Sequence, residues 1–175
     1  RYGETLCVNF FKQYNVPVKI VRPFNNYGPG MSLNDGRVVS DFFQNVLKKQ
    51  NIELFSDGKA TRTFCYVADA INAYLLVLLS EYNGHVFNVG NPEPEISVED
   101  LAKKIIEITN SNLTIHKTTS SDVEYLTDNP KRRCPDISKI SKMLDFKPLI
   151  SLETGLLKSY RFYLESYKGI LWRLT

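Results

Sequence analysis

Apolar residues recur along this chain with two different spacings, and the spacing predicts where helices and strands lie. In residues 2–14 they stand at every fourth position, which places them on one face of a helix. Residues 16–21 form instead a short β-branched run of the kind that becomes a buried strand. A polar, glycine-rich segment follows, and a second helical pattern extends from Val38 to about Gln50. Strand, loop and helix in this order are typical of an α/β protein.

The middle of the chain predicts a pair of strands and a long helix. Residues 52–55 and 61–64 read as strands joined by the turn Ser56–Lys59, so the second strand is expected to return beside the first as in a β-hairpin. The helix is predicted from Val67 to Tyr82, and its apolar stripe is expected to pack in the core rather than to bind a cofactor. The stripe consists of Val67, Ile71, Leu75, Leu78 and Leu79.

The last third of the chain predicts shorter elements. Strands are expected over residues 85–89 and 113–116. Residues 118–133 have little periodicity and many turn-forming residues, which predicts a long functional or mobile loop. Three further helices are expected to begin at side chains that cap a helix well. These caps are Ser97, Asp136 and Ser151.

Composition and charge narrow the class of protein. The 175 residues fit one domain, or one domain and part of another. The formal charge of +3 is too small to favour a nucleic acid or an acidic membrane as partner, and the basic run Lys131–Arg133 is short. Three cysteines without metal-ligand spacing favour reduced thiols in a cytoplasmic protein. The sequence contains no signal peptide and no apolar segment long enough to span a membrane.

The titratable residues form no recognisable catalytic or metal-binding unit. His85 and His116 lie far apart in strand-like segments, without Cys, Asp or Glu at ligand spacing, so structural or surface roles are expected. Asp57 fits a turn, and Asp69 fits the start of a helix, where a carboxylate favours the helix dipole. We therefore expect no metal site, and no complete catalytic unit is apparent within this chain.

The most informative segment is the polar loop after the first predicted strand. Arg22–Met31 and Asn34–Arg37 contain three glycines, which let the backbone turn tightly and approach a ligand, and two prolines, which stiffen it. In α/β proteins ligands bind beyond the carboxyl ends of the strands, where this loop begins. From spacing alone, an ordinary connection rich in turn residues is an equal alternative.

Three later segments carry further motifs in the same order: Asp57–Asp69, Phe87–Asn91 and Asp128–Asp136. Together with the polar loop they resemble the extended short-chain dehydrogenases/reductases that modify nucleotide sugars, and within them the UDP-glucuronate decarboxylases. The resemblance implies an α/β fold, namely the carboxy-terminal part of a Rossmann-type parallel sheet plus a small α/β substrate-binding subdomain. Residues 1–175 are then expected to be the carboxy-terminal half of such an enzyme.

Two motifs of the resembled family are not in this sequence. There is no Gly-x-x-Gly-x-x-Gly turn of an NAD-binding half, and the catalytic Tyr-x-x-x-Lys dyad would end just before Arg1. We therefore expect NAD as the cofactor of the intact enzyme, and we expect residues 1–175 alone neither to bind it well nor to catalyse a reaction. The alternative from another class is a binding or structural domain without activity, derived from the same fold.

The resemblance also implies a substrate site built from separate loops. Substrate-binding roles carry over to Asn25, Arg37, Arg62 and Arg133, and cofactor contacts carry over to Asn26 and Arg37. Arginine suits the diphosphate of a nucleotide sugar, because its planar guanidinium offers paired donors and stays charged. Taken one at a time, each arginine is more often a solvated surface charge.

The implied reaction oxidises the sugar at C4, releases the C6 carboxylate as carbon dioxide and reduces the ketone again. Gly30 stands where decarboxylases often have a basic residue, and Asn25–Pro29 resembles the 4,6-dehydratases, so a 4,6-dehydratase or 4-epimerase is the alternative. A UDP-sugar is the implied partner. A homodimer is also expected. Its contacts would come from the helix face formed by Tyr2, Leu6, Phe10 and Tyr14.

Overall fold

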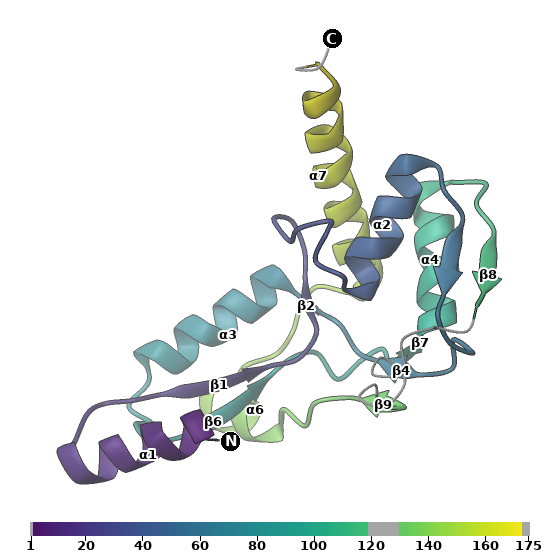
Figure 1. The fold of residues 1–175 in the computed structure, drawn as a ribbon. Helices are drawn as coiled ribbons and strands as arrows, with labels where there is room; N and C mark the ends of the chain where they lie inside the picture. Colours follow the sequence, from purple (N-terminus) through teal and green to yellow (C-terminus); the bar gives the residue numbers. More distant parts are fainter. Residues whose placement is uncertain (1, 119–129, 173–175) are drawn as a thin grey trace.

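The chain folds into helices and short, mostly parallel strand pairs, as the sequence predicts for an α/β protein (Figure 1). The computed structural model describes residues 2–118 and 130–172. Its first helix, α1 (Tyr2–Tyr14), has the predicted bounds.

The Rossmann-type part of the fold is built around one parallel strand pair. Strand β1 (Ile20–Pro23) pairs with β6 (Val86–Val89), and the register runs from Ile20 opposite Val86 to Pro23 opposite Val89. Helices α3 (Val67–Leu79) and α6 (Ser138–Leu144) contact these strands. The core between them contains Cys65, Ala70, Ala73, Val77, Phe87, Val89, Ile140 and Phe146.

A second cluster of elements forms the smaller α/β unit. Helices α2 (Val38–Lys48), α4 (Val98–Thr109) and α7 (Leu152–Trp172) contact one another, and α2 also contacts β3 (Ile52–Leu54). Strand β3 pairs in parallel with β8 (Ile115–Lys117). The largest buried side chains of this core are Phe43, Ile52, Leu101, Ile105 and Leu156.

Two small sheets lie between these parts. Strand β2 (Asn26–Tyr27) pairs in parallel with β5 (Cys65–Tyr66). In the other sheet β4 (Thr61–Arg62) is central, antiparallel to β7 (Ile96–Ser97) and parallel to β9 (Arg132–Arg133). These two sheets carry Arg62 and Arg133, two of the four predicted substrate residues, and Asn26, a predicted cofactor contact.

The predicted hairpin between residues 52–55 and 61–64 is wrong. Strand β3 pairs with β8, and β4 pairs with β7 and β9. The connecting turn is bonded to the start of α4 instead, because Val98 N donates to Ala60 O at 3.0 Å and Glu99 N donates to Gly58 O at 3.1 Å. These bonds direct β4 toward β7 rather than back along β3.

Several element ends differ from prediction. Strand β1 begins at Ile20 rather than Val16, since Pro17 offers no N–H and Val18 N donates back to Val16 O at 2.7 Å. Strand β8 begins two residues later than predicted. Within the predicted loop 118–133, Arg132–Arg133 form strand β9, and residues 119–129 lie outside the described residues.

Helix α3 buries a different face from the predicted one. Ile71, Leu75, Leu78 and Leu79 are 50–78% exposed, so their assignment to the core is wrong. The buried face carries Ala70, Ala73 and Val77, whose small side chains let the helix approach β1 and β6 closely. The helix is apolar on several sides, so periodicity alone identifies no single buried face.

Two of the three predicted caps are confirmed by hydrogen bonds. The third is wrong in position, because α6 has Ile137 rather than Asp136 at its cap, although Asp136 Oδ1 accepts from Ser138 N at 2.8 Å. Ser97 Oγ accepts from Asp100 N at 3.0 Å, and Ser151 Oγ accepts from Thr154 N at 3.2 Å. Helical spacing places the apolar residues of α7 at positions 152, 156, 160 and 163 on one face, and Leu152, Leu156 and Tyr163 are buried there. Among the described helices, none is long and apolar enough to cross a membrane.

Candidate functional site

Asn25 joins the loop after β1 to the segment after β4. It adopts a left-handed backbone conformation, with φ of 43°. Its side-chain Nδ2 donates to Thr63 O at 2.8 Å, and its backbone oxygen accepts from Cys65 N at 3.2 Å. The loop at the carboxyl end of β1 is therefore held against the strand that carries Arg62.

Arg62 and Arg133 lie directly beside each other in neighbouring parallel strands. The register of β4 and β9 places Thr61 opposite Arg132 and Arg62 opposite Arg133. Residues paired in this way extend from the same face of a sheet, so the two arginines share a face. Arg62 is 8% exposed, whereas Arg133 is exposed. The bond from Thr63 N to Arg133 O, at 3.3 Å, continues the pairing.

This arrangement brings three of the four predicted substrate residues to one place. Thr63 is the common neighbour, because it follows Arg62 in the chain, accepts from Asn25 and donates to Arg133. Two positive side chains on one face of neighbouring strands repel each other. A bound anion with several oxygens would relieve that repulsion and accept paired hydrogen bonds from both guanidiniums.

Arg37 is not brought to the same place. Its Nε lies 2.7 Å from Asp35 Oδ2, and its side chain is 63% exposed. It stands immediately before α2, at the cap position, without a capping side-chain bond. A role for Arg37 in substrate or cofactor binding stays a prediction.

Asn26 presents a buried acceptor that could serve a ligand. Its Nδ2 is hydrogen-bonded to the Tyr74 hydroxyl, while its Oδ1 is buried and has no hydrogen-bond partner within the described residues. Burial raises the pKa of Tyr74, which keeps that phenol protonated. A buried acceptor without a partner favours an incoming N–H donor. Asn26 therefore fits a carboxamide such as that of nicotinamide.

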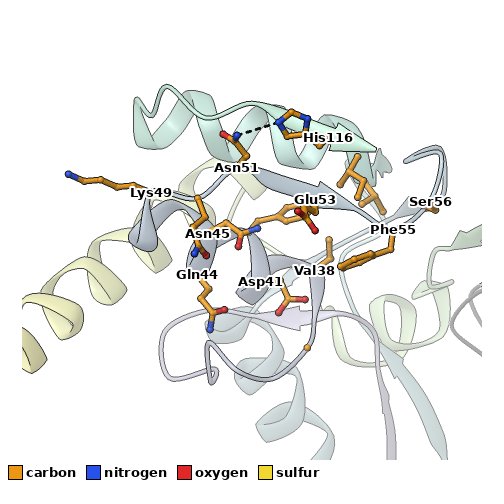
Figure 2. Close-up of a pocket in the computed structure, with 15 residues that line it drawn as sticks. Val38, Asp41, Gln44, Asn45, Lys49, Asn51, Glu53, Phe55, Ser56 and His116 are labelled. Carbon is orange, nitrogen blue, oxygen red and sulfur yellow. Dashed lines mark hydrogen bonds between the residues drawn. The ribbon is translucent and has the colours of Figure 1, made fainter. Parts of the chain in front are cut away.

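A polar pocket of about 1090 Å³ opens beside α2, β3 and β8 (Figure 2). Its wall includes the acidic side chains of Asp41 and Glu53 and the exposed ring of Phe55. Burial, with a smaller effect of the Asp35 charge, raises the pKa of Asp41. Asn25, Arg37, Arg62 and Arg133 are not among its lining residues.

The pocket nevertheless adjoins the arginine pair along the chain. Val98 lines it, and Val98 N donates to Ala60 O, two residues before Arg62. Gly36 and Val38, on either side of Arg37, also line it. The pocket wall is thus linked to β4 through the backbone bond between Val98 and Ala60.

Sequence reasoning missed several residues that shape this site. Thr63 is fully buried, and its Oγ1 has no partner among the described residues. The Tyr163 hydroxyl donates to the carbonyl oxygens of Gly28 and Met31, at 2.9 and 2.8 Å. Thr63 lies inside the motif segment Asp57–Asp69, so the sequence did contain a signal that could have marked it as a site residue. No local pattern marks Tyr163, because its partners are more than 130 positions away.

Neither histidine belongs to the group formed by Asn25, Arg62 and Arg133. His116 is exposed and bonds to Asn51 and Thr114, at 3.3 and 2.9 Å, on the rim of the pocket. His85 packs against Tyr82 and Phe87. Within residues 2–118 and 130–172, no cluster of His, Cys, Asp and Glu could hold a metal ion.

Sequence comparison identifies relatives that are all much longer than this chain. It is 38% identical over 156 residues to UDP-glucuronic acid decarboxylase 2 of Arabidopsis thaliana, covering 89% of this chain and 34% of the relative. It is 36% identical over 163 residues to UDP-glucuronic acid decarboxylase 1 of Xenopus tropicalis. That match covers 93% of this chain and 37% of the relative. The chain therefore spans less than half the length of these relatives.

Solved structures share the fold over about half of their length. UDP-glucose 4-epimerase of Thermotoga maritima, solved with UDP-glucose, matches 94% of this chain and 52% of its own with a TM-score of 0.86 and 25% identity. UDP-glucuronic acid 4-epimerase of Bacillus cereus was solved with UDP-glucuronic acid and NAD. The match covers 96% of this chain and 50% of the epimerase, with a TM-score of 0.81 and 28% identity. The model of the NAD dependent epimerase/dehydratase family matches residues 1–90. The chain belongs to this family.

Proposed function

We propose that the intact protein is an NAD-dependent enzyme that modifies a nucleotide sugar, and that it decarboxylates UDP-glucuronate. The observation that carries this proposal is the in-register pair Arg62 and Arg133, which offers two guanidiniums to one diphosphate. The choice of decarboxylation is supported by relatives of that name at 35–41% identity. Residues 1–175 are the carboxy-terminal, substrate-binding half in this proposal.

The substrate is oriented by its diphosphate. With the diphosphate on Arg62 and Arg133, the nucleoside extends along β4 into the pocket, where Phe55 is 47% exposed and can contact the base. The sugar then lies toward Asn25, whose loop is bonded to Thr63. Arg37, beside the pocket wall, is available to a more distant part of the substrate or to the cofactor.

The chemistry follows from oxidation at C4 of the sugar. When bound, NAD supplies the acceptor for the C4 hydride and its later return. A carbonyl at C4 stands β to the C6 carboxylate. When the C5–C6 bond breaks, carbon dioxide leaves and the electron pair of that bond is delocalised onto the C4 carbonyl as an enolate. The residues of this chain would bind and orient the sugar nucleotide, and the buried Asn26 Oδ1, which has no partner among the described residues, would accept a hydrogen bond from the nicotinamide carboxamide. In this proposal the acid–base dyad is supplied by a part of the intact enzyme outside residues 1–175.

The intact protein is proposed to be a cytoplasmic homodimer. The exposed apolar face of α1 supports this, because Tyr2 and Tyr14 are 81% and 61% exposed, and Leu6 and Phe10 are nearly half exposed. Such a face on a helix favours contact with its symmetry mate.

The 4-epimerase and 4,6-dehydratase remain the second candidates, because the loop Asn25–Pro29 resembles dehydratases and the solved structures of similar fold include both activities. The deciding experiment supplies the intact protein with NAD and UDP-glucuronate, separates the nucleotide sugars by chromatography so that 4-epimers are resolved, and identifies them by mass spectrometry. Decarboxylation gives UDP-xylose and carbon dioxide. UDP-galacturonate would instead identify a 4-epimerase, and UDP-glucuronate recovered unchanged with measurable binding would favour a domain without activity.

A further inference from the structure

The β7-β4-β9 sheet has a second polar cluster on the face opposite the arginine pair. Strand residues alternate between faces, so Thr61 and Arg132 extend away from Arg62 and Arg133. Glu95 immediately precedes β7 and reaches the same face as Thr61 and Arg132.

One carboxylate joins all three strands of this sheet. Glu95 Oε1 accepts from Thr61 Oγ1 at 2.5 Å and from Arg132 Nε at 2.9 Å. Glu95 Oε2 accepts from Arg132 Nη2 at 2.8 Å, which makes the ion pair bidentate. Hydrogen bonds from Arg132 and Thr61 lower the pKa of Glu95, so the carboxylate stays charged at neutral pH.

The site needs such a connection because the strands are short. Strands β4 and β9 have two residues each, and beyond their ladder they are joined by Thr61 N to Lys131 O at 2.8 Å and Thr63 N to Arg133 O at 3.3 Å. On the other face, the same two strands carry Arg62 and Arg133, whose relative position depends on this pairing.

We propose that Glu95 is a positioning residue for substrate binding: by bridging Thr61 and Arg132, it holds β9 in register with β4 and keeps Arg133 beside Arg62. The inference rests on the proposed function, since it assigns Glu95 an effect on the diphosphate site. Glu95 itself lies on the far face of the sheet and acts through Arg133.

The test compares Michaelis constants for the nucleotide sugar in the intact protein. Glu95→Ala is expected to raise KM by about three- to fivefold with kcat unchanged, the scale set by loss of an exposed ion pair. Thr61→Val, which removes one bond and keeps the side-chain shape, is expected to act in the same direction. A double variant that exchanges the two charges, Glu95→Arg with Arg132→Glu, keeps an ion pair between these positions. Its KM should return to within about twofold of that of the unmodified protein.

A double-mutant cycle separates positioning from a general structural effect. In the Arg133→Ala background, Glu95→Ala should add nothing to KM, because the side chain that it positions is gone. Glu99→Gln is the matched control, since its side chain pairs with Lys103 and Lys117 at 3.1 and 2.6 Å, and neither lysine belongs to this sheet. Its KM should stay within about twofold, and circular dichroism should show that all variants are folded.

The outcomes are distinguishable. If Arg133→Ala raises KM while both Glu95→Ala and Thr61→Val leave it unchanged, the positioning role is overturned and the proposed function stands. If Glu99→Gln raises KM as much as Glu95→Ala does, the effect is one of surface charge and the inference also fails. If neither Arg62→Ala nor Arg133→Ala raises KM, the diphosphate site itself is wrong.

Discussion

The hydroxyl of Tyr163 lies 2.9 Å from the carbonyl oxygen of Gly28, so a hydrogen bond joins the last helix to the glycine-rich loop. The same hydroxyl lies 2.8 Å from Met31 O. Tyr163 is 4% exposed, and Gly28 is buried with φ of +151°. A loop that begins at the carboxyl end of β1 is thereby shaped by contacts from the opposite end of the chain.

Removing that hydroxyl should weaken the fold. Tyr163→Phe leaves two carbonyl groups without their donor and is expected to lower the free energy of unfolding by about 1–3 kcal/mol. Chemical denaturation followed by circular dichroism measures this. Tyr160→Phe is the control on the same helix, because the Tyr160 hydroxyl makes no hydrogen bond to another described residue. Equal losses for both variants would contradict the assigned role of the Tyr163 contact.

Gly155 is expected to tolerate no side chain. A Cβ at this position in α7 would overlap the hydroxyl of Tyr27, which donates to Leu152 O at 3.1 Å. Gly155→Ala should destabilise by about 1–3 kcal/mol, as overpacking does in a filled core. Gly3→Ala, on exposed α1 with nothing within 4 Å, should instead stabilise by about 0.5–1 kcal/mol. Thermal unfolding of the two variants should therefore shift in opposite directions.

The two arginines of the proposed substrate site should affect binding of the nucleotide sugar strongly. In the intact enzyme, Arg62→Ala or Arg133→Ala should raise KM roughly ten- to hundredfold, because each removes a charge-assisted hydrogen bond worth about 1.5–3 kcal/mol. Lysine should restore only part of the affinity, because it keeps the charge but loses the planar fork. Arg161→Ala, at an exposed position of α7, is the control. Kinetic constants within about twofold at both site positions would refute the assignment.

Cys65 should resist alkylation in the folded protein. It is fully buried, and burial together with the nearby Asp69 raises the pKa of its thiol to about 12. Since the thiolate is the nucleophile, only about one molecule in 10⁴ would be reactive at pH 8 even with access. Peptide mass spectrometry after maleimide treatment should show labelling of the partly exposed Cys7 before Cys65. Addition of denaturant should remove the difference, and rapid native labelling of Cys65 would contradict its burial.

The proposed dimer makes a prediction about α1. Leu6→Asp or Phe10→Asp places a charge in the exposed apolar face and should shift the intact protein toward monomer in analytical ultracentrifugation. Lys12→Glu also changes the charge of α1 but lies on another side of the helix, so it should leave the dimer intact. A monomer in the unmodified intact protein at micromolar concentration would exclude the proposal.

The sequence by itself predicted the elements whose signals are local. Ser97 and Ser151 cap their helices through bonds to residues three positions away, so the helix starts are readable from a few neighbouring residues. The buried face of α7 is also readable from the sequence, because Leu152, Leu156 and Tyr163 recur with helical spacing. Motif resemblance singled out Asn25, Arg62 and Arg133 as site residues, although it could not place them relative to one another.

Only the tertiary structure decided which segments meet. The pairing of Arg62 with Arg133 joins strands that are more than 60 residues apart, and strand register depends on the packing of both faces and on contacts such as Glu95 with Arg132. The buried face of α3 was likewise decided by its packing on β1 and β6. The small side chains of Ala70 and Ala73 let the helix lie closer to these strands than leucine side chains would. The spacing of apolar residues shows which faces of a helix are apolar. Whether such a face is buried depends on the element that packs against it.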